Sequence, residues 1–161
     1  MTATAALFGW RGHAWIALAA RLYLAHVFIF ACWFKILDPA GFALSVATYQ
    51  LLPLPLINIT ALVMPWTELL AGAMLLLGLR VRAAALLVCA MMVVFMVALA
   101  WALHLGLDMS CGCFASDSKA DPISGLTMLR DGGWLALAAY VLVFDRNPLG
   151  LDRLISRRRA G

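Results

Sequence analysis

Charged side chains are scarce in this sequence. Only 12% of its 161 residues are Asp, Glu, Lys or Arg, and 65% are hydrophobic, whereas soluble globular domains carry about 25% charged residues. The mean hydropathy is +0.97. These values exclude an ordinary soluble protein, and no internal repeat or low-complexity tract stands out. We therefore expect a single membrane domain over residues 1–161, with little chain left for a soluble one.

Long hydrophobic runs take the place of the missing charge. Four of them are long enough to cross a hydrocarbon core, which takes roughly 20 apolar residues; they cover residues 14–34, 55–79, 83–105 and 126–144. Such runs form helices, because a backbone exposed to lipid must satisfy its own N–H and C=O groups. The sequence predicts an all-α integral membrane protein, a bundle of four transmembrane helices.

A short fifth helix is predicted between the first two spans. Asp38 and Pro39 have the pattern of a helix N-cap followed by a proline in the first turn. Phe42, Val46 and Tyr49 follow at helical spacing. An amphipathic helix of this kind can lie in the membrane interface, so we expect it to cover one end of the bundle, although a simple connector fits the pattern as well.

The distribution of arginines predicts the orientation. Arg11 precedes the first span, Arg80 and Arg82 separate the second from the third, and five more arginines follow the fourth. Because basic residues concentrate in cytoplasmic loops, both termini are expected in the cytoplasm. No small-residue cleavage site follows the first span, which indicates a retained helix in the inner membrane. The net charge of +4 reflects this asymmetry, so the expected partner of the tail is the lipid bilayer and not nucleic acid.

Two of the four cysteines lie in the polar stretch between the third and fourth spans, as Cys111-Gly112-Cys113. The predicted orientation places them on the periplasmic side, where disulfides persist. A bond between them would close a strained ring, and strained, exposed disulfides exchange readily. This favours a redox-active pair over a structural bridge. Cys32, near the outer end of the first span, is a candidate third thiol, although a packed helix-end cysteine fits equally; Cys89 reads as a small buried hydrophobe.

Soft-metal binding is the rival interpretation of this loop. His104, Asp108, Cys111 and Cys113 are close in sequence, and two thiolates with an imidazole suit Zn²⁺ or Cu(I). The spacing is unspecific, however, and the loop offers no clear fourth ligand. We therefore expect no metal.

Glu68 is the notable residue inside the membrane, where an ionisable group is costly unless it has a partner. Counting depth along antiparallel helices places His26 level with Glu68 and Arg21 about one turn deeper. These three residues are candidates for a polar pocket that binds a quinone head group or carries protons. The alternative is a buried pair that fixes helix register. Arg130, at the outer end of the fourth span, is a cation that can favour a thiolate, or it forms an interfacial charge pair with Asp131.

Taken in order, several short segments resemble the DoxX superfamily and, within it, the MauE-like proteins. The segments are Arg21, Lys35-Ile36-Leu37-Asp38-Pro39, Phe42, Tyr49-Gln50-Leu51-Leu52-Pro53, Pro65-Trp66-Thr67-Glu68-Leu69, Gly72, Gly78-Leu79, Cys111-Gly112-Cys113-Phe114 and Leu129-Arg130-Asp131. They run along almost the whole chain. Ala115 departs from the glycine that relatives place after Cys-Gly-Cys-Phe, which leaves the thiols intact and puts the same loop turn in doubt.

The resemblance implies both a fold and a function. The fold is a four-helix membrane bundle. MauE-like proteins are associated with maturation of a disulfide-rich periplasmic dehydrogenase, alongside a thioredoxin-like partner. The resemblance assigns redox work to Cys111 and Cys113 and gives Cys32 no role. Quinone-linked disulfide oxidases have a similar layout, which is a weaker analogy.

Together these observations suggest a membrane thiol–disulfide oxidoreductase that exchanges disulfides with an extracytoplasmic thioredoxin-like protein and passes electrons to quinone. Oxidation of the partner is the favoured direction, because only Cys89 lies near the inner face to feed a reductive path. Two other classes stay open. One is a non-catalytic assembly or maturation subunit for a periplasmic redox enzyme, and the other is a soft-metal-binding membrane protein.

Overall fold

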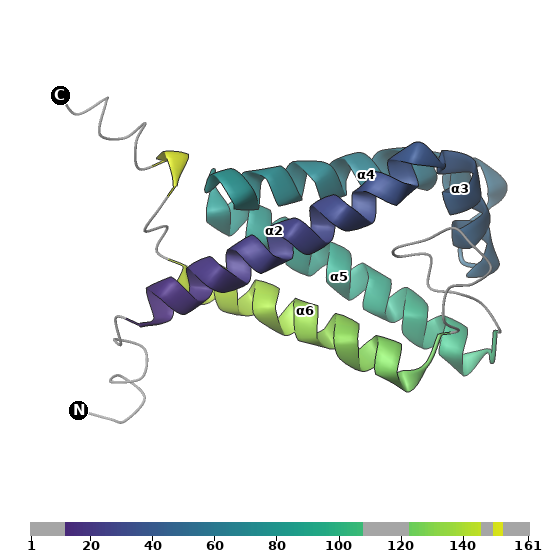
Figure 1. The fold of residues 1–161 in the computed structure, drawn as a ribbon. Coiled ribbons are helices and arrows are strands. Elements are labelled where there is room, and N and C mark those ends of the chain that lie inside the picture. Colours follow the sequence, from purple (N-terminus) through teal and green to yellow (C-terminus); the bar gives the residue numbers. More distant parts are fainter. Residues whose placement is uncertain (1–11, 108–122, 146–149, 153–161) are drawn as a thin grey trace.

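The computed structural model describes residues 12–107, 123–145 and 150–152, and the regular structure in these ranges is helical. The long helices are α2 (His13–Leu37), α4 (Leu54–Leu77), α5 (Val81–His104) and α6 (Gly125–Phe144), and the short helix α3 (Pro39–Thr48) joins the first two (Figure 1). Each long helix overlaps one predicted span and is long and apolar enough to cross a membrane. The predicted four-helix architecture is therefore confirmed.

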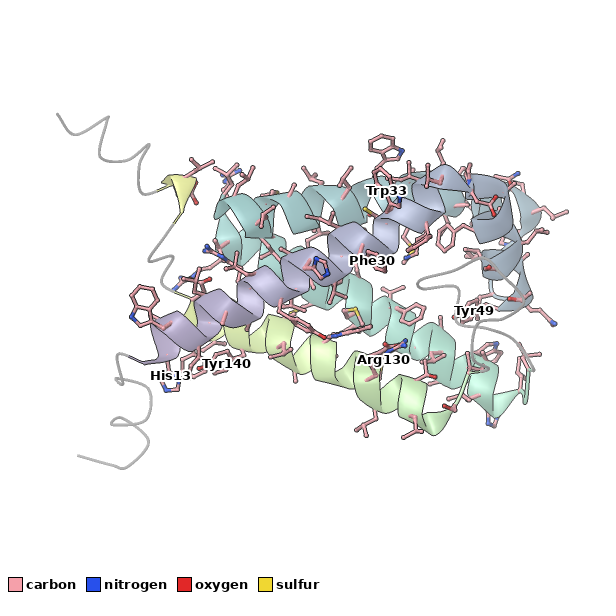
Figure 2. The ribbon with its side chains drawn as sticks, viewed as in Figure 1. His13, Phe30, Trp33, Tyr49, Arg130 and Tyr140 are labelled. Carbon is pink, nitrogen blue, oxygen red and sulfur yellow. The ribbon has the colours of Figure 1, made fainter. Side chains whose placement is uncertain are left out.

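The long helices alternate in direction. Helix α3, the last turn of α5 and the first turn of α6 lie at one end of the bundle, called here the α3 end (Figure 1). The start of α2, the turn between α4 and α5 and the last turn of α6 lie at the opposite end. His13 and Tyr140 meet at this opposite end, where His13 Nδ1 and the Tyr140 hydroxyl are 2.7 Å apart (Figure 2). Which end faces the cytoplasm stays a prediction.

Small residues bring the helices close together. Ala25, Ala71, Ala85 and Ala138 are fully buried in the main core. Gly72 of α4 faces α2 so closely that an added Cβ would lie 2.9 Å from Ile29 Cγ1 and 3.3 Å from the Ala25 carbonyl oxygen. Without a side chain the two backbones can approach, as is common between membrane helices. This contact fixes the register of α4 against α2.

Local sequence explains where α3 begins and where α4 ends. The Asp38 carboxylate accepts a hydrogen bond from the Gly41 N–H at 2.9 Å, with Pro39 in the first turn, so the predicted N-cap is confirmed. Phe42 and Tyr49 are buried, which ties α3 to the bundle. Gly78 ends α4 in the left-handed conformation (φ 66°) that glycine adopts without strain.

Candidate functional site

Lys35 of α2 and Glu68 of α4 form an ion pair within the bundle. Lys35 Nζ donates to Glu68 Oε1 at 2.6 Å, and the side chains are only 7% and 6% exposed. The ammonium also lies 5.1 Å from the centre of the Phe42 ring, within cation–π range. Removing two charges from water costs several kcal/mol per ion, so such a pair persists only with good geometry.

The partners predicted for Glu68 were wrong. Arg21 instead pairs with Asp145 of α6, Nη1 to Oδ2 at 3.4 Å, with both side chains buried. His26 is exposed on the bundle surface and stacks on Phe30, with ring centroids 6.1 Å apart. The reason is register. Because Gly72 packs between Ala25 and Ile29, Glu68 lies about one turn closer to the α3 end than the depth count assumed, and the long side chain of Lys35 reaches it.

A small cavity surrounds this ion pair. Its volume is about 50 Å³, and each long helix contributes to its wall. Glu68 and Asp131 both line it, and their side chains are buried. Among the described residues, neither Glu68 Oε2 nor Asp131 Oδ2 has a hydrogen-bond partner. Buried polar atoms are normally satisfied, so these two oxygens make the cavity a candidate site for protons, water or a ligand.

Asp131 is held by its neighbour in sequence. Arg130 Nε donates to Asp131 Oδ1 at 2.9 Å, and the guanidinium lies 4.8 Å from the centre of the Trp134 ring. The Arg130 side chain is 42% exposed, whereas Asp131 is fully buried. The expected charge pair is present. A role of Arg130 beside a thiolate stays a prediction, because Cys111 and Cys113 lie outside the described residues.

A larger cavity adjoins the first. It has a volume of about 280 Å³ and lies between α3, α4 and α5. Its wall is almost entirely apolar, and Lys35 is the charged residue among those that line it. Lys35, Met64 and Phe95 line both cavities. The side chain of Lys35 therefore lies between a small cavity lined in part by two carboxylates and a larger, almost entirely apolar one.

The segment that carries the cysteine pair joins the bundle beside this larger cavity. Leu107, which precedes the segment, and Ile123, which follows it, pack against Tyr49 and Ala102. Tyr49 also lines the larger cavity, and it lies at the α3 end (Figure 2). Tyr49 therefore belongs both to the cluster against which the two ends of the cysteine segment pack and to the wall of the larger cavity.

Comparison with known protein families shows a match for this chain. The sequence model described as methylamine utilisation protein MauE matches residues 13–144. The chain belongs to the MauE family. The match runs from the start of α2 to the end of α6 and so includes both cavities and the Cys-Gly-Cys sequence. No curated protein and no solved structure matches significantly. The resemblance seen in the sequence is confirmed, and the chain is a multi-pass membrane protein of a family involved in methylamine utilisation.

The remaining predicted site features of this MauE-family protein are the third thiol, Cys32, and the possible metal ligands. Cys32 is 1% exposed, and its Sγ lies 3.1 Å from the Ile29 carbonyl oxygen, to which the thiol donates. Its role as a third thiol stays a prediction. The described residues, which do not include Asp108, Cys111 or Cys113, contain no group of three or more His, Cys, Asp or Glu side chains placed to hold a metal ion.

Sequence reasoning overlooked three contributions to the site. Lys35 was assigned no role in the site, although the Lys35 ammonium is buried against Glu68. Asp131 was expected at the interface, although it is fully buried. Tyr49 was noted only for its helical spacing after Phe42 and Val46, although it lines the larger cavity. One signal was available: a lysine in the last turn of a membrane helix has a stem long enough to fold back along that helix.

Proposed function

We propose that this MauE-family protein is a membrane thiol–disulfide oxidoreductase whose Cys111–Cys113 pair oxidises an extracytoplasmic thioredoxin-like partner and passes the electrons to quinone. The supporting observation is one of position. The Cys-Gly-Cys sequence lies between α5 and α6 in the chain, and the two helix ends that flank it are at the α3 end. There the bundle contains a buried ion pair, two cavities and two carboxylate oxygens without a partner among the described residues.

The exchange proceeds through a mixed disulfide. A thiolate of the reduced partner attacks one sulfur of the Cys111–Cys113 disulfide, and the other sulfur leaves as a thiolate that takes up a proton. The second partner thiolate then attacks the partner's own sulfur in the mixed disulfide, and the loop sulfur leaves as a thiolate that takes up a proton. The partner leaves oxidised and the loop pair is left as a dithiol. Two electrons and two protons pass from this dithiol to quinone, which becomes hydroquinone, and the loop disulfide forms again.

The charges at the opposite end support the proposed orientation. Arg80 and Arg82 lie at the turn between α4 and α5, on the end away from the cysteine segment. If this end is cytoplasmic, as the positive-inside rule predicts, the loop pair faces the periplasm of the inner membrane. That compartment favours disulfides and is where the family resemblance places a thioredoxin-like partner.

The cysteine content allows a matched experiment. Turnover is measured as quinone-dependent oxidation of a reduced thioredoxin-like protein by the purified protein in nanodiscs. The variant Cys111→Ser/Cys113→Ser is expected to lose turnover. The control, Cys32→Ala/Cys89→Ala, has the loop pair as its only cysteines and is expected to keep it. Full turnover in the first variant would show that the loop pair does not carry the reaction, and no turnover in the native protein would favour a non-catalytic assembly subunit.

A further inference from the structure

We infer that the larger cavity binds the ring of a membrane quinone, with the Lys35 ammonium donating a hydrogen bond to one ring carbonyl. This inference deepens the proposed function by naming the site of the electron acceptor. It is carried by the cavity, by Lys35 as the one charged side chain among the described residues of its wall, and by the packing of Leu107 and Ile123, which flank the cysteine segment, against Tyr49 of that wall.

The volume and lining of the cavity suit a substituted six-membered ring. About 280 Å³ is close to the lower end of the range for small-molecule sites, roughly 300–1,000 Å³. Phe42, Tyr49 and Phe95 offer aromatic surface, and the remaining lining is mainly aliphatic. Lipid-soluble quinones combine an apolar ring and tail with two carbonyl oxygens that only accept hydrogen bonds. An apolar cavity with a hydrogen-bond donor in its wall matches that chemistry, whereas an acyl chain has no acceptor for the donor to bond.

Lys35 has the capacity to serve both cavities. An ammonium has three N–H donors. One of them bonds Glu68 Oε1 at 2.6 Å, and Lys35 lines both chambers. A second N–H directed into the apolar chamber would polarise a quinone carbonyl and stabilise the negative charge that reduction places on its oxygen.

The smaller cavity supplies groups that can hold protons next to this ring. Quinone reduction takes up two protons together with two electrons, and the loop dithiol releases two of each as its disulfide forms. Glu68 Oε2 and Asp131 Oδ2 are buried beside Lys35 and have no partner among the described residues. Carboxylates in membrane helices often mark proton paths. We assign them to proton transfer between the ring and its surroundings.

Binding is tested with a decyl-substituted azidobenzoquinone as the probe, photolysed on the full-length protein in phosphatidylcholine nanodiscs and mapped by mass spectrometry. Label is expected on α3 and on the α5 segment from Val94 to Ala98. Ala98→Phe fills the cavity and is expected to weaken probe binding at least about tenfold. Ala90→Phe is the matched control, because Ala90 lies on the same helix, is exposed and is not part of the cavity wall. It should bind as the native protein does.

A second variant tests the donor. Lys35→Met/Glu68→Gln removes both members of the ion pair and so leaves no unpaired buried charge. It is expected to weaken binding by roughly tenfold, the effect of losing one charge-assisted hydrogen bond. Unchanged binding in both this variant and Ala98→Phe would overturn the site, as would label confined to other helices. Displacement of the probe by an alkane of equal length as well as by unlabelled quinone would show a lipid-chain site and overturn it too.

The cysteine variant separates this inference from the proposed function. Cys111→Ser/Cys113→Ser leaves the cavity intact and is expected to bind the probe with native affinity. If it binds while the native protein fails to oxidise a thioredoxin-like partner, the quinone site stands and the oxidoreductase proposal fails. If the native protein oxidises the partner with quinone while Ala98→Phe keeps full binding and turnover, the proposed function stands and this site is wrong.

Discussion

Lys35 and Glu68 lie 33 residues apart in the chain and form a 2.6 Å ion pair inside the bundle. The pair joins α2 to α4 where the four long helices share a cavity. Two buried charges are a poor way to gain stability, because well-packed apolar residues often do as well. Glu68 Oε2 and Asp131 Oδ2, which have no partner among the described residues, line the same cavity.

The ion pair should behave as a coupled unit. Lys35→Met alone leaves the Glu68 carboxylate buried without a cation and is expected to cost about 3–5 kcal/mol of unfolding free energy. Lys35→Met/Glu68→Gln should recover most of this loss. The measurement is SDS-induced unfolding in mixed micelles followed by circular dichroism. Arg82→Met, which removes an exposed cation, should change little. A double variant no more stable than Lys35→Met alone would show that the pair is not formed.

Close packing of α2 on α4 depends on Gly72. Gly72→Ala places a methyl group 2.9 Å from Ile29 Cγ1 and is expected to destabilise the bundle by about 1–3 kcal/mol, as overpacking does. Gly133→Ala is the matched control, because nothing lies within 4 Å of its added Cβ and alanine is the better helix former. In the same unfolding assay, Gly72→Ala should have a clearly lower unfolding free energy than Gly133→Ala. Equal stability would contradict the register described here.

Helix α3 is anchored by its N-cap. Asp38→Ala removes the acceptor for the Gly41 N–H and is expected to cost about 0.5–2 kcal/mol, whereas Asp38→Asn should keep most of the stability. Because α3 forms one wall of the larger cavity, hydrogen exchange in the segment from Gly41 to Tyr49 should rise in the alanine variant. Equal exchange in the two variants would show that the cap does not hold α3 in place.

Cys32 should be unreactive in the folded protein. In a Cys89→Ala/Cys111→Ser/Cys113→Ser background, a polar maleimide is expected to modify Cys32 only after denaturation, because its side chain is 1% exposed. Leu37→Cys, combined with Cys32→Ala in the same background, places a thiol at a residue that is 66% exposed and should react readily. Equal rates at the two positions would mean that a soluble partner can reach Cys32, and would favour its role as a third thiol.

Much of the fold could be predicted from sequence because hydropathy and capping are local signals. The apolar runs marked the long helices to within a few residues, and Asp38-Pro39 marked the start of α3. Side-chain pairing was harder to predict because it depends on how far neighbouring helices slide past one another. That slide is set by the contact of Gly72 with Ile29, which no local pattern reveals.

In the candidate site, too, local features could be predicted from the sequence, whereas features that depend on helix packing could not. Glu68 was singled out correctly as a buried ionisable group, since its cost in a membrane can be read from its position. Its partner, Lys35, and the larger cavity could not be predicted, because both depend on how α2, α3, α4 and α5 pack together. The redox role of Cys111 and Cys113 remains a prediction from sequence and family. The structure describes only the residues that flank their segment, such as Leu107 and Ile123.

The most direct test of the account is the thiol state of Cys111 and Cys113 in native membranes, read by alkylation and mass mapping. The account predicts a Cys111–Cys113 disulfide that becomes a pair of free thiols when a reduced thioredoxin-like protein is added without quinone, and forms again when quinone is supplied. A disulfide that stays intact under both conditions would contradict it and leave an assembly subunit. Thiols that are free yet protected from alkylation would contradict it in favour of a bound soft metal.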